Sequence, residues 1–211
     1  MASSALLEFD RTRGTRVAGA DEAGRGCLAG PIVAAGVAFN YDTISDEDLS
    51  TLAALNDSKK LSADRREMLF GEITRIATSV ALISRSATYI DQMGLHRTNL
   101  HCLGSALSRV NERGTVLLSD GYMPFGLEDP CEAVVKGDAT SAAIAAASII
   151  AKVSRDRYMN QIAAAYPEYA FEKHVGYATP VHRDAIIEFG PTPIHRRSFA
   201  STAYEQFQLV A

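Results

Sequence analysis

The sequence of 211 residues lacks an uninterrupted apolar segment long enough to cross a membrane. Residues 27–41 carry no charge, but Gly30, Pro31 and Gly36 interrupt them. A spanning helix needs about 20 apolar residues, so the sequence argues against a membrane protein. No basic residue precedes the first apolar patch, and Glu8 and Asp10 follow closely behind it. We therefore expect no signal peptide and a cytoplasmic protein.

Cysteine is scarce, and the common motifs of several enzyme classes are missing. The three cysteines, Cys27, Cys102 and Cys131, are odd in number and widely spaced, so they form neither a disulfide framework nor a zinc motif. We expect small core residues in a reducing compartment. The sequence contains no HExxH, no paired CxxC, no phosphate loop ending in Gly-Lys-Ser/Thr and no Gly-x-Ser-x-Gly. Zincin, P-loop and serine-hydrolase chemistry therefore have no support.

The overall composition is that of an ordinary soluble globular protein, with 47% hydrophobic and 22% charged residues. The formal net charge of −4 argues mildly against a general nucleic-acid coat protein, which would be basic. It does not exclude a nucleic-acid enzyme, because the local charge at a site matters more than the total.

Hydrophobic patterns predict strands and helices that alternate early and become mostly helical late. We expect strands at residues 16–21, 30–39, 80–83, 115–119 and 131–135. We expect helices at residues 61–76, 96–110, 139–165, 180–190 and 202–209, with an acidic, solvated loop at residues 42–48. This order predicts an α/β catalytic domain over residues 1–166 and a helical C-terminal segment over residues 167–211 packed on it.

The first candidate for chemistry is the run Asp21-Glu22-Ala23-Gly24-Arg25-Gly26, directly after a predicted strand. Neighbouring carboxylates on a regular strand point to opposite faces, so both can face one site only if the backbone turns there. The glycines would permit that turn and a close approach to a ligand, and Arg25 is a planar donor for phosphate. The alternative is an ordinary surface turn with solvated acids.

Two more acids stand at informative places. Asp120 ends the apolar run 116–119, where it can serve catalysis or simply form an Asp-Gly turn. Asp156 lies in the long alanine-rich helix after Lys152, where it can be a ligand or half of an ordinary ion pair. Hard divalent cations prefer several carboxylate oxygens, and two such ions can drive phosphoryl transfer. Asp21, Glu22, Asp120 and Asp156 together would form that site.

At these residues the sequence resembles bacterial ribonuclease HII. The matching stretches are DEAGRG at 21–26, DSKKLS at 57–62, DG at 120–121, KGD at 136–138, ASIIAKVSRD at 147–156, GYATPVH at 176–182 and HRRSF at 195–199. The resemblance implies a ribonuclease H fold, a five-stranded mixed sheet flanked by helices. It also implies a metal-dependent endonuclease that cuts the RNA of RNA–DNA hybrids and single ribonucleotides embedded in duplex DNA.

The resemblance further implies roles for individual residues. Asp21, Glu22, Asp120 and Asp156 would bind two Mg²⁺ or Mn²⁺ ions and act in catalysis. Gly24, Arg25 and Gly26 would contact the ribose 2′-hydroxyl and the nearby backbone, and Tyr177 would stack on the sugar at the RNA–DNA junction. The remaining predicted substrate contacts are Lys59, Lys60, Arg196 and Ser198. Ala178 replaces a glycine that the family often has, and alanine resists a positive φ.

The implied reaction is attack of a metal-activated water on the phosphorus 5′ to the ribonucleotide, leaving 3′-hydroxyl and 5′-phosphate ends. We expect a monomer that acts on these duplexes away from membranes, and the sequence names no replication or transcription partner. Two alternatives stay open at this point. One is an integrase-like strand-transfer enzyme, and the other is a duplex-binding module without catalysis.

Overall fold

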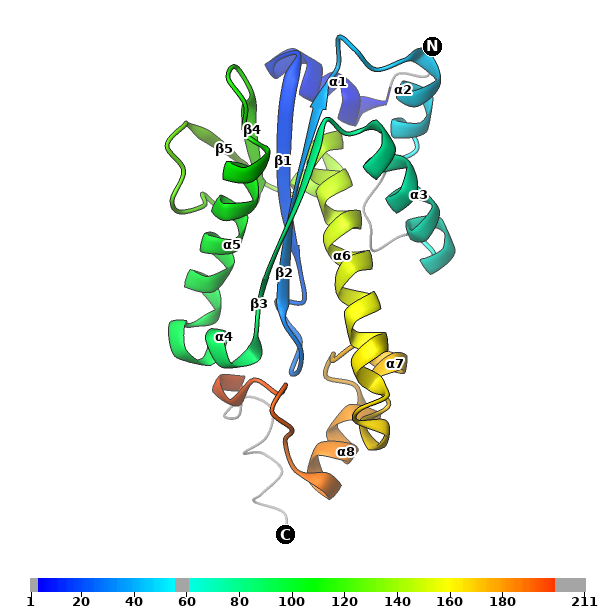
Figure 1. Cartoon of the computed structure of the whole chain (residues 1–211), viewed down its shortest axis with the longest axis vertical. Helices are drawn as coiled ribbons and strands as arrows, with labels where there is room; N and C mark the ends of the chain where they lie inside the picture. The colour runs from blue at the N-terminus through cyan, green and yellow to red at the C-terminus, as the bar shows by residue number, and fades with distance from the viewer. Residues whose placement is uncertain (1–3, 56–60, 200–211) are drawn as a thin grey trace.

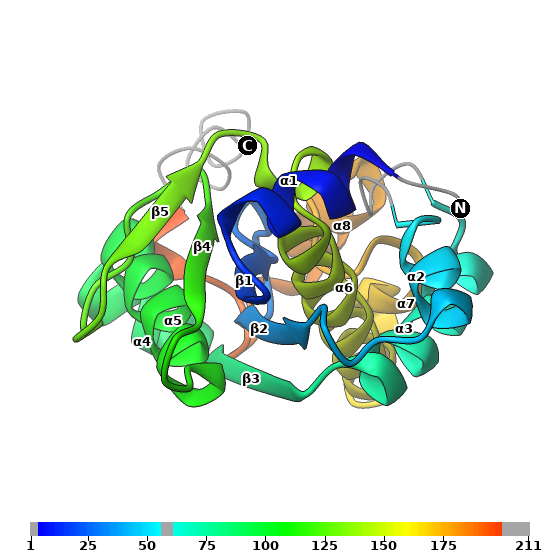
Figure 2. The ribbon, with the colours of Figure 1, turned by 90° about the horizontal axis from the view of Figure 1, so that it is seen from above.

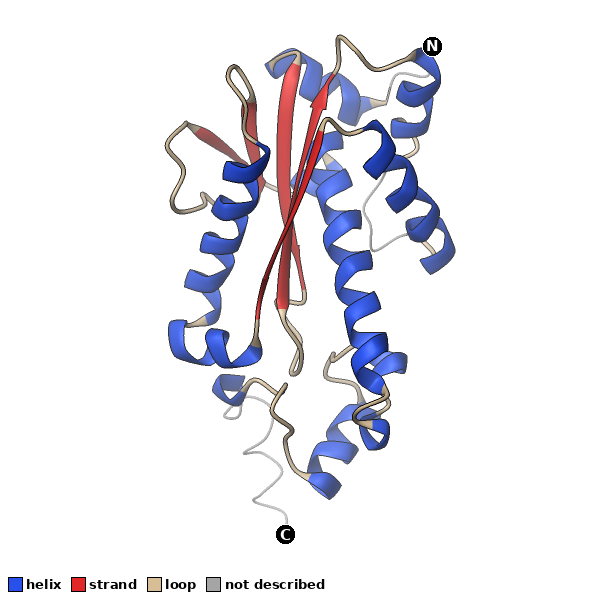
Figure 3. Ribbon diagram, viewed as in Figure 1, coloured by secondary structure: helices blue, strands red, loops and turns tan. Residues whose placement is uncertain are grey.

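The computed structural model describes residues 4–55 and 61–199. Its centre is one five-stranded sheet in the order β3-β2-β1-β4-β5, shown in Figure 3. The antiparallel strands β1 (Arg16–Ala23), β2 (Ile32–Asn40) and β3 (Ser79–Arg85) follow one another, and β4 (Val116–Asp120) and β5 (Cys131–Val134) run parallel to β1. The predicted five-stranded mixed sheet is confirmed.

Helices cover both faces of this sheet, as Figure 2 shows from above. On one face lies α6 (Ala142–Ala163) with α1 (Ala5–Arg13) and α3 (Ala63–Ile76), and on the other lie α5 (Leu95–Val110) and α4 (Ala87–Met93). Residues of β1 alternate between these faces: Val17 packs with α6, and Ala18 with α5. A Cβ on Gly19 would lie 2.3 Å from the backbone of Ala143, so glycine lets α6 approach the sheet closely.

Local signals explain where several helices begin. Ser62, Ser141 and Thr179 each accept a backbone N–H from three residues later, at the starts of α3, α6 and α8 (Pro180–Phe189). The predicted loop at 42–48 is wrong in its second half, because α2 (Asp46–Leu52) begins there behind the cap Ser45. Acids in a first helical turn are favoured by the helix dipole, which the sequence interpretation overlooked.

The C-terminal part of the described chain forms short helices beyond the lower end of the sheet in Figure 1. They are a 3-10 turn at Pro167–Tyr169, α7 (Phe171–His174), α8 and a 3-10 turn at Arg197–Phe199. Their apolar residues pack with Leu28, Ala29 and Met159. The division at residue 166 stays a prediction, and the predicted helix 202–209 lies outside the described residues. None of the helices in residues 4–55 and 61–199 is long and apolar enough to span a membrane.

Candidate active site at the ends of the central strands

Asp21 and Glu22 lie inside β1, not after it. The strand pairs them with Ala35 and Ala34 of β2 and continues to Ala23, so the expectation that the acids follow the strand is wrong, and the backbone does not turn between them. Their side chains therefore leave the strand on opposite faces. Asp21 faces α6 and is hydrogen-bonded to Ser148. Glu22 faces α5, where burial and then its charge raise the pKa of Cys102 to about 11.

Asp120 comes level with Asp21 on the same face of the sheet. The parallel register places Ala20 beside Ser119, so the next residue of each strand is an acid. The backbone N–H of Gly137 donates to Oδ1 of Asp120 at 2.6 Å. Burial raises the pKa of Asp21 well above its usual range, and the charges of Glu22 and Asp120 raise it further. A cation at this place would relieve the crowding of negative charge.

Asp156 lies two turns beyond Ser148 on α6, about 12 Å further along the helix. Its Oδ1 is 2.9 Å from Nζ of Lys152, so the ion pair considered as the simpler alternative is present. The same ammonium lies 5.4 Å from the ring centroid of Tyr177. Lys152 therefore links the fourth acid to the tyrosine that the sequence places in substrate binding.

The donor set of this site suits a hard divalent cation. Within residues 4–55 and 61–199, no three His, Cys, Asp or Glu side chains come close enough to hold an ion by themselves. Mg²⁺ commonly keeps several waters and binds through one or two carboxylates plus substrate phosphates. Asp21 and Asp120 lie level on neighbouring strands, and the pKa of Asp21 is raised by burial and by the neighbouring charges, so the two carboxylates fit that kind of site.

Two buried arginines hold the Gly24–Gly26 turn against the C-terminal loops. Arg155 donates to the carbonyl oxygens of Pro31 at 3.0 Å, Ala29 at 3.0 Å and Val175 at 2.8 Å. Arg196 donates to the carbonyls of Gly30 and Arg25. Both side chains are fully buried, so the prediction that Arg196 contacts the substrate directly is wrong. Backbone carbonyls offset the cost of burying its charge, and it shapes the turn instead.

Tyr177 is 41% exposed and follows a loop tied to the same region, since Gly176 accepts a hydrogen bond from Leu28 at 2.9 Å. The non-glycine residues with positive φ in the described chain do not include Ala178, so its methyl group does not strain the loop. The hydroxyl and N–H of Ser198 both donate to Asp91 of α4. These bonds tie Ser198 to α4 and stabilise the turn in which it lies, while its predicted contact with the substrate stays a prediction. Lys59 and Lys60 lie outside the described residues.

A buried histidine cluster beside Tyr177 was not assigned a role from the sequence. Nδ1 of His182 is 2.8 Å from the carbonyl of Tyr177, and its Nε2 is 3.0 Å from Nε2 of His195. The third ring, His174, stacks on His182 with centroids 4.4 Å apart. Burial lowers the pKa of His182 to about 4 and that of His195 to about 3. The available clue was that His182 and His195 each belong to one of the last two motifs, with His174 just before them.

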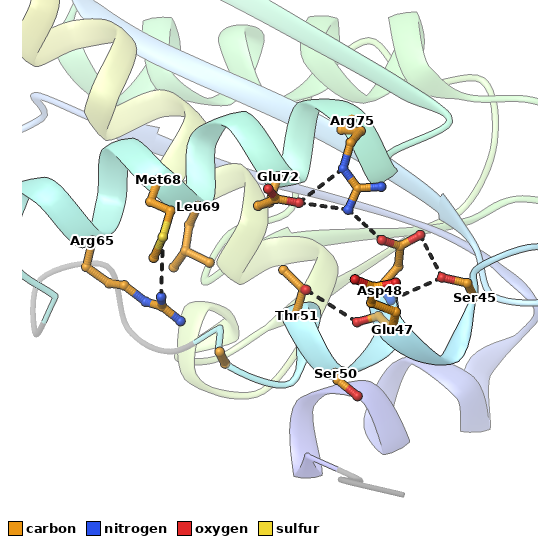
Figure 4. A pocket seen from close by; sticks show the side chains of 11 residues that line it. Ser45, Glu47, Asp48, Ser50, Thr51, Arg65, Met68, Leu69, Glu72 and Arg75 are labelled. Carbon is orange, nitrogen blue, oxygen red and sulfur yellow. Dashed lines mark hydrogen bonds and ion pairs between the residues drawn. The ribbon is translucent and has the colours of Figure 1, made fainter.

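A separate hollow of about 720 Å³ lies between α2 and α3 (Figure 4). Arg75 crosses it and pairs with Glu72 at 2.7 Å and with Asp48 at 2.5 Å. The described members of the predicted site do not line it, so this hollow is distinct from the carboxylates.

Comparison with known proteins agrees with this geometry. The family model of ribonuclease HII matches residues 18–202. A ribonuclease HII of Rhizobium johnstonii is 48% identical over 184 residues, covering 87% of this chain and 77% of the relative. The crystal structure of ribonuclease H2 from Pyrococcus horikoshii OT3 has a TM-score of 0.73 and 27% identity, covering 92% of this chain and 99% of that one.

The fold is also shared with a crystal structure of Bst-RNase HIII in complex with Mn²⁺, at 19% identity and a TM-score of 0.65. That match covers 96% of this chain and 72% of the Bst-RNase HIII chain. The family match spans most of the chain and includes both strands that carry the carboxylates, Asp21 and Asp120. This chain belongs to the ribonuclease HII family and is a ribonuclease H, an endonuclease that hydrolyses RNA.

Proposed function

We propose that this ribonuclease H cuts the RNA strand of RNA–DNA hybrids and cleaves 5′ to single ribonucleotides embedded in duplex DNA. The products carry 3′-hydroxyl and 5′-phosphate ends, and the role is removal of ribonucleotides from DNA in the cytoplasm. The observation that carries the proposal is the placement of the glycine turn immediately after the acid-bearing strand. β1 delivers Asp21 and Glu22, and the turn at Gly24 follows within two residues.

The glycine turn supports recognition of ribose. RNA differs from DNA by the 2′-hydroxyl, which both donates and accepts hydrogen bonds. A Cβ added to Gly26 would meet no described atom within 4 Å, so the turn presents its backbone to open space. Arg196 holds the carbonyl of Arg25 within the turn, and Arg155 holds that of Pro31 beyond it. A rigid backbone next to the acids can discriminate one hydroxyl group, because misplacement by about 1 Å is costly in an enzyme site.

Asp21 and Asp120 would hold Mg²⁺ or Mn²⁺ from the same face of the sheet. Glu22 and Asp156 are the other two proposed ligands, but in this structure Glu22 leaves β1 on the opposite face and Asp156 is paired with Lys152. Two such ions, when bound, supply an activated water and stabilise the charge on the attacking and leaving oxygens. Asp21 and Asp120 face this place from neighbouring strands, and Gly137 orients the Asp120 carboxylate. Tyr177 exposes its ring beside Lys152, where it can stack on a sugar or base.

The direct test replaces Asp120 by asparagine and measures cleavage of a DNA duplex that contains one ribonucleotide. We expect Asp120→Asn to lose most activity while unfolding at a similar denaturant concentration, because the amide keeps the shape and removes the charge. Asp46→Asn makes the same chemical change in the first turn of α2 and is the matched control. Full activity of Asp120→Asn would overturn the assignment.

The same assay separates the two alternatives. Joining of DNA ends by the wild-type protein would favour a strand-transfer enzyme. Duplex binding in chelator with no cleavage after metal is added would favour a binding module. We expect neither result, because binding alone needs no crowded carboxylates, which repel phosphate in the absence of metal.

A further inference from the structure

Three side chains from three different segments stack beside the proposed site. The guanidinium carbon of Arg25 lies 4.6 Å from the ring centroid of Tyr122. Tyr122 also contacts His96 of α5: the two ring centroids are 5.4 Å apart and the ring planes meet at 73°, an edge-on arrangement. Tyr122 therefore sits between the glycine turn and the first turn of α5.

The position of Tyr122 is coupled directly to Asp120. Tyr122 donates its backbone N–H to the carbonyl of Asp120 at 2.7 Å, and Gly121 between them has a φ of +65°. This tight turn carries the chain from the end of β4 straight to the aromatic ring. The N–H of Gly121 is in turn bonded to Val134 of β5 at 2.9 Å, which anchors the turn to the sheet.

Two neighbouring side chains, Glu22 and Tyr122, hold the Arg25 guanidinium in place. Its Nη1 lies 3.8 Å from Oε1 of Glu22, and its guanidinium lies over Tyr122. The side chain keeps 34% of its surface exposed, and Tyr122 is 40% exposed. A planar, partly exposed guanidinium held on an aromatic face is prepared to bind a phosphate oxygen without first losing much side-chain freedom.

We propose that Tyr122 is a positioning residue for the substrate, and that it acts by holding the Arg25 guanidinium toward the phosphate backbone beside the ribonucleotide. The inference rests on the proposed function, because it assumes that the glycine turn faces such a duplex. It adds a residue from outside the glycine turn and the four acids. Tyr122 would couple the turn that follows Asp120 to the turn that follows Glu22.

The expected effect is on binding more than on the chemical step. Arg25 would contact the backbone both before and during reaction, so its loss raises KM with little change in kcat. A cation–π contact at an exposed site corresponds to a change of about two- to five-fold. Tyr122→Ala and Tyr122→Leu should raise KM by that factor, and Tyr122→Phe, which keeps the ring, should retain the wild-type KM.

The controls separate positioning from a structural role. Met123→Ala changes the next residue in the same exposed loop and should leave KM unchanged. The double variant Arg25→Ala/Tyr122→Ala should be no weaker than Arg25→Ala alone, since one acts through the other. Loss of the Arg25 phosphate contact should also reduce the slope of log KM against log salt concentration by about one. Tyr122→Ala should show part of that reduction.

Additive effects of the two substitutions, or an unchanged KM in Tyr122→Leu that folds normally, would overturn the inference. A Tyr122→Phe variant with a KM as high as that of Tyr122→Ala would also overturn it, because the ring face would then not be what holds Arg25. If the wild-type protein itself leaves a duplex with one ribonucleotide uncut, the proposed function has failed. If the wild type cuts and Tyr122→Leu matches it, only the inference has failed.

Discussion

Replacement of Gly24 by alanine should lower the stability of the protein at the Gly24–Gly26 turn. Gly24 has a φ of +89°, a conformation that L residues rarely adopt. An added Cβ would lie 2.0 Å from Nε of Arg155, 2.6 Å from its Cδ and 2.8 Å from the carbonyl oxygen of Pro31. Two of these three atoms belong to a fully buried arginine, so relief requires that side chain to move.

The cost can be worked from those contacts. An alanine in the left-handed region costs about 1–2 kcal/mol. Movement of Arg155 breaks its bond to Pro31 and leaves a buried donor and acceptor unsatisfied, which costs roughly 1–3 kcal/mol. Together these two costs should lower the free energy of unfolding by about 2–5 kcal/mol, a large share of the roughly 5–15 kcal/mol that a native protein has.

Gly26 provides the matched control in the same turn. It does not have a positive φ, and its added Cβ would meet no described atom. Gly26→Ala should therefore keep the wild-type stability or gain up to about 1 kcal/mol, since it restricts the unfolded chain. Activity on a duplex with one ribonucleotide should still fall, because the methyl group occupies the space in which the backbone would meet the ribose.

Urea denaturation of the three proteins, followed by circular dichroism, gives the free energies directly, with unchanged m-values as the check on two-state unfolding. A Gly24→Ala protein within about 1 kcal/mol of the wild type would refute the packing argument, which requires Arg155 to move and to lose its bond to Pro31. Equal destabilisation of Gly26→Ala would refute the claim that only Gly24 faces a packed environment.

Two other predictions concern charge. Asp21→Asn should raise the melting temperature of the metal-free protein, because it removes a buried charge crowded by Glu22 and Asp120. The variant should also show a smaller rise in melting temperature when Mn²⁺ is added than the wild type does. If scanning calorimetry shows the same Mn²⁺-induced rise in both proteins, Asp21 is not a ligand. Because the pKa values of His182 and His195 are lower in the folded protein, the unfolded state binds more protons below pH 6.5. Their contribution to the free energy of unfolding is therefore full above pH 6.5 and is lost as the pH falls toward the folded-state pKa values of about 4 and about 3. His182 alone should lower the free energy of unfolding by about 2 kcal/mol between pH 7 and pH 5. Urea denaturation at both pH values tests this, and a His182→Gln variant whose stability depends on pH as strongly as the wild type would contradict it.

Local features of the chain were predictable because they depend on neighbours in sequence. Thr179-Pro180 begins α8 and Gly190 ends it, as the capping residues indicate. The alanine-rich segment forms α6, and Asp120 ends a buried strand. These elements need only short-range hydrogen bonds and backbone preferences, so their residue types identify them. The acidic stretch before α2 shows the limit, since its acids stabilise a helix start as readily as a loop.

The site was predictable as a set of residues but not as an arrangement. Asp21 and Glu22 are adjacent in the chain, yet the continuation of β1 to Ala23 sends them to opposite faces. Strand length depends on pairing with β2, which no local pattern specifies. Ser148, which bonds Asp21, comes from α6 and was recognisable only once that helix was packed along β1, whereas the pair of Lys152 with Asp156 lies within one helix and was open to prediction.

The sequence by itself determined the family, the order of the elements and the acids that its motifs contain. The tertiary structure decided which side chains face the substrate and which hold the fold. Arg196 illustrates the difference, because an arginine in a basic motif is ordinarily exposed, and only carbonyls from Gly30 and Arg25, more than 160 residues away, make its burial favourable. Such compensation is set by contacts between distant segments, so composition and spacing cannot reveal it.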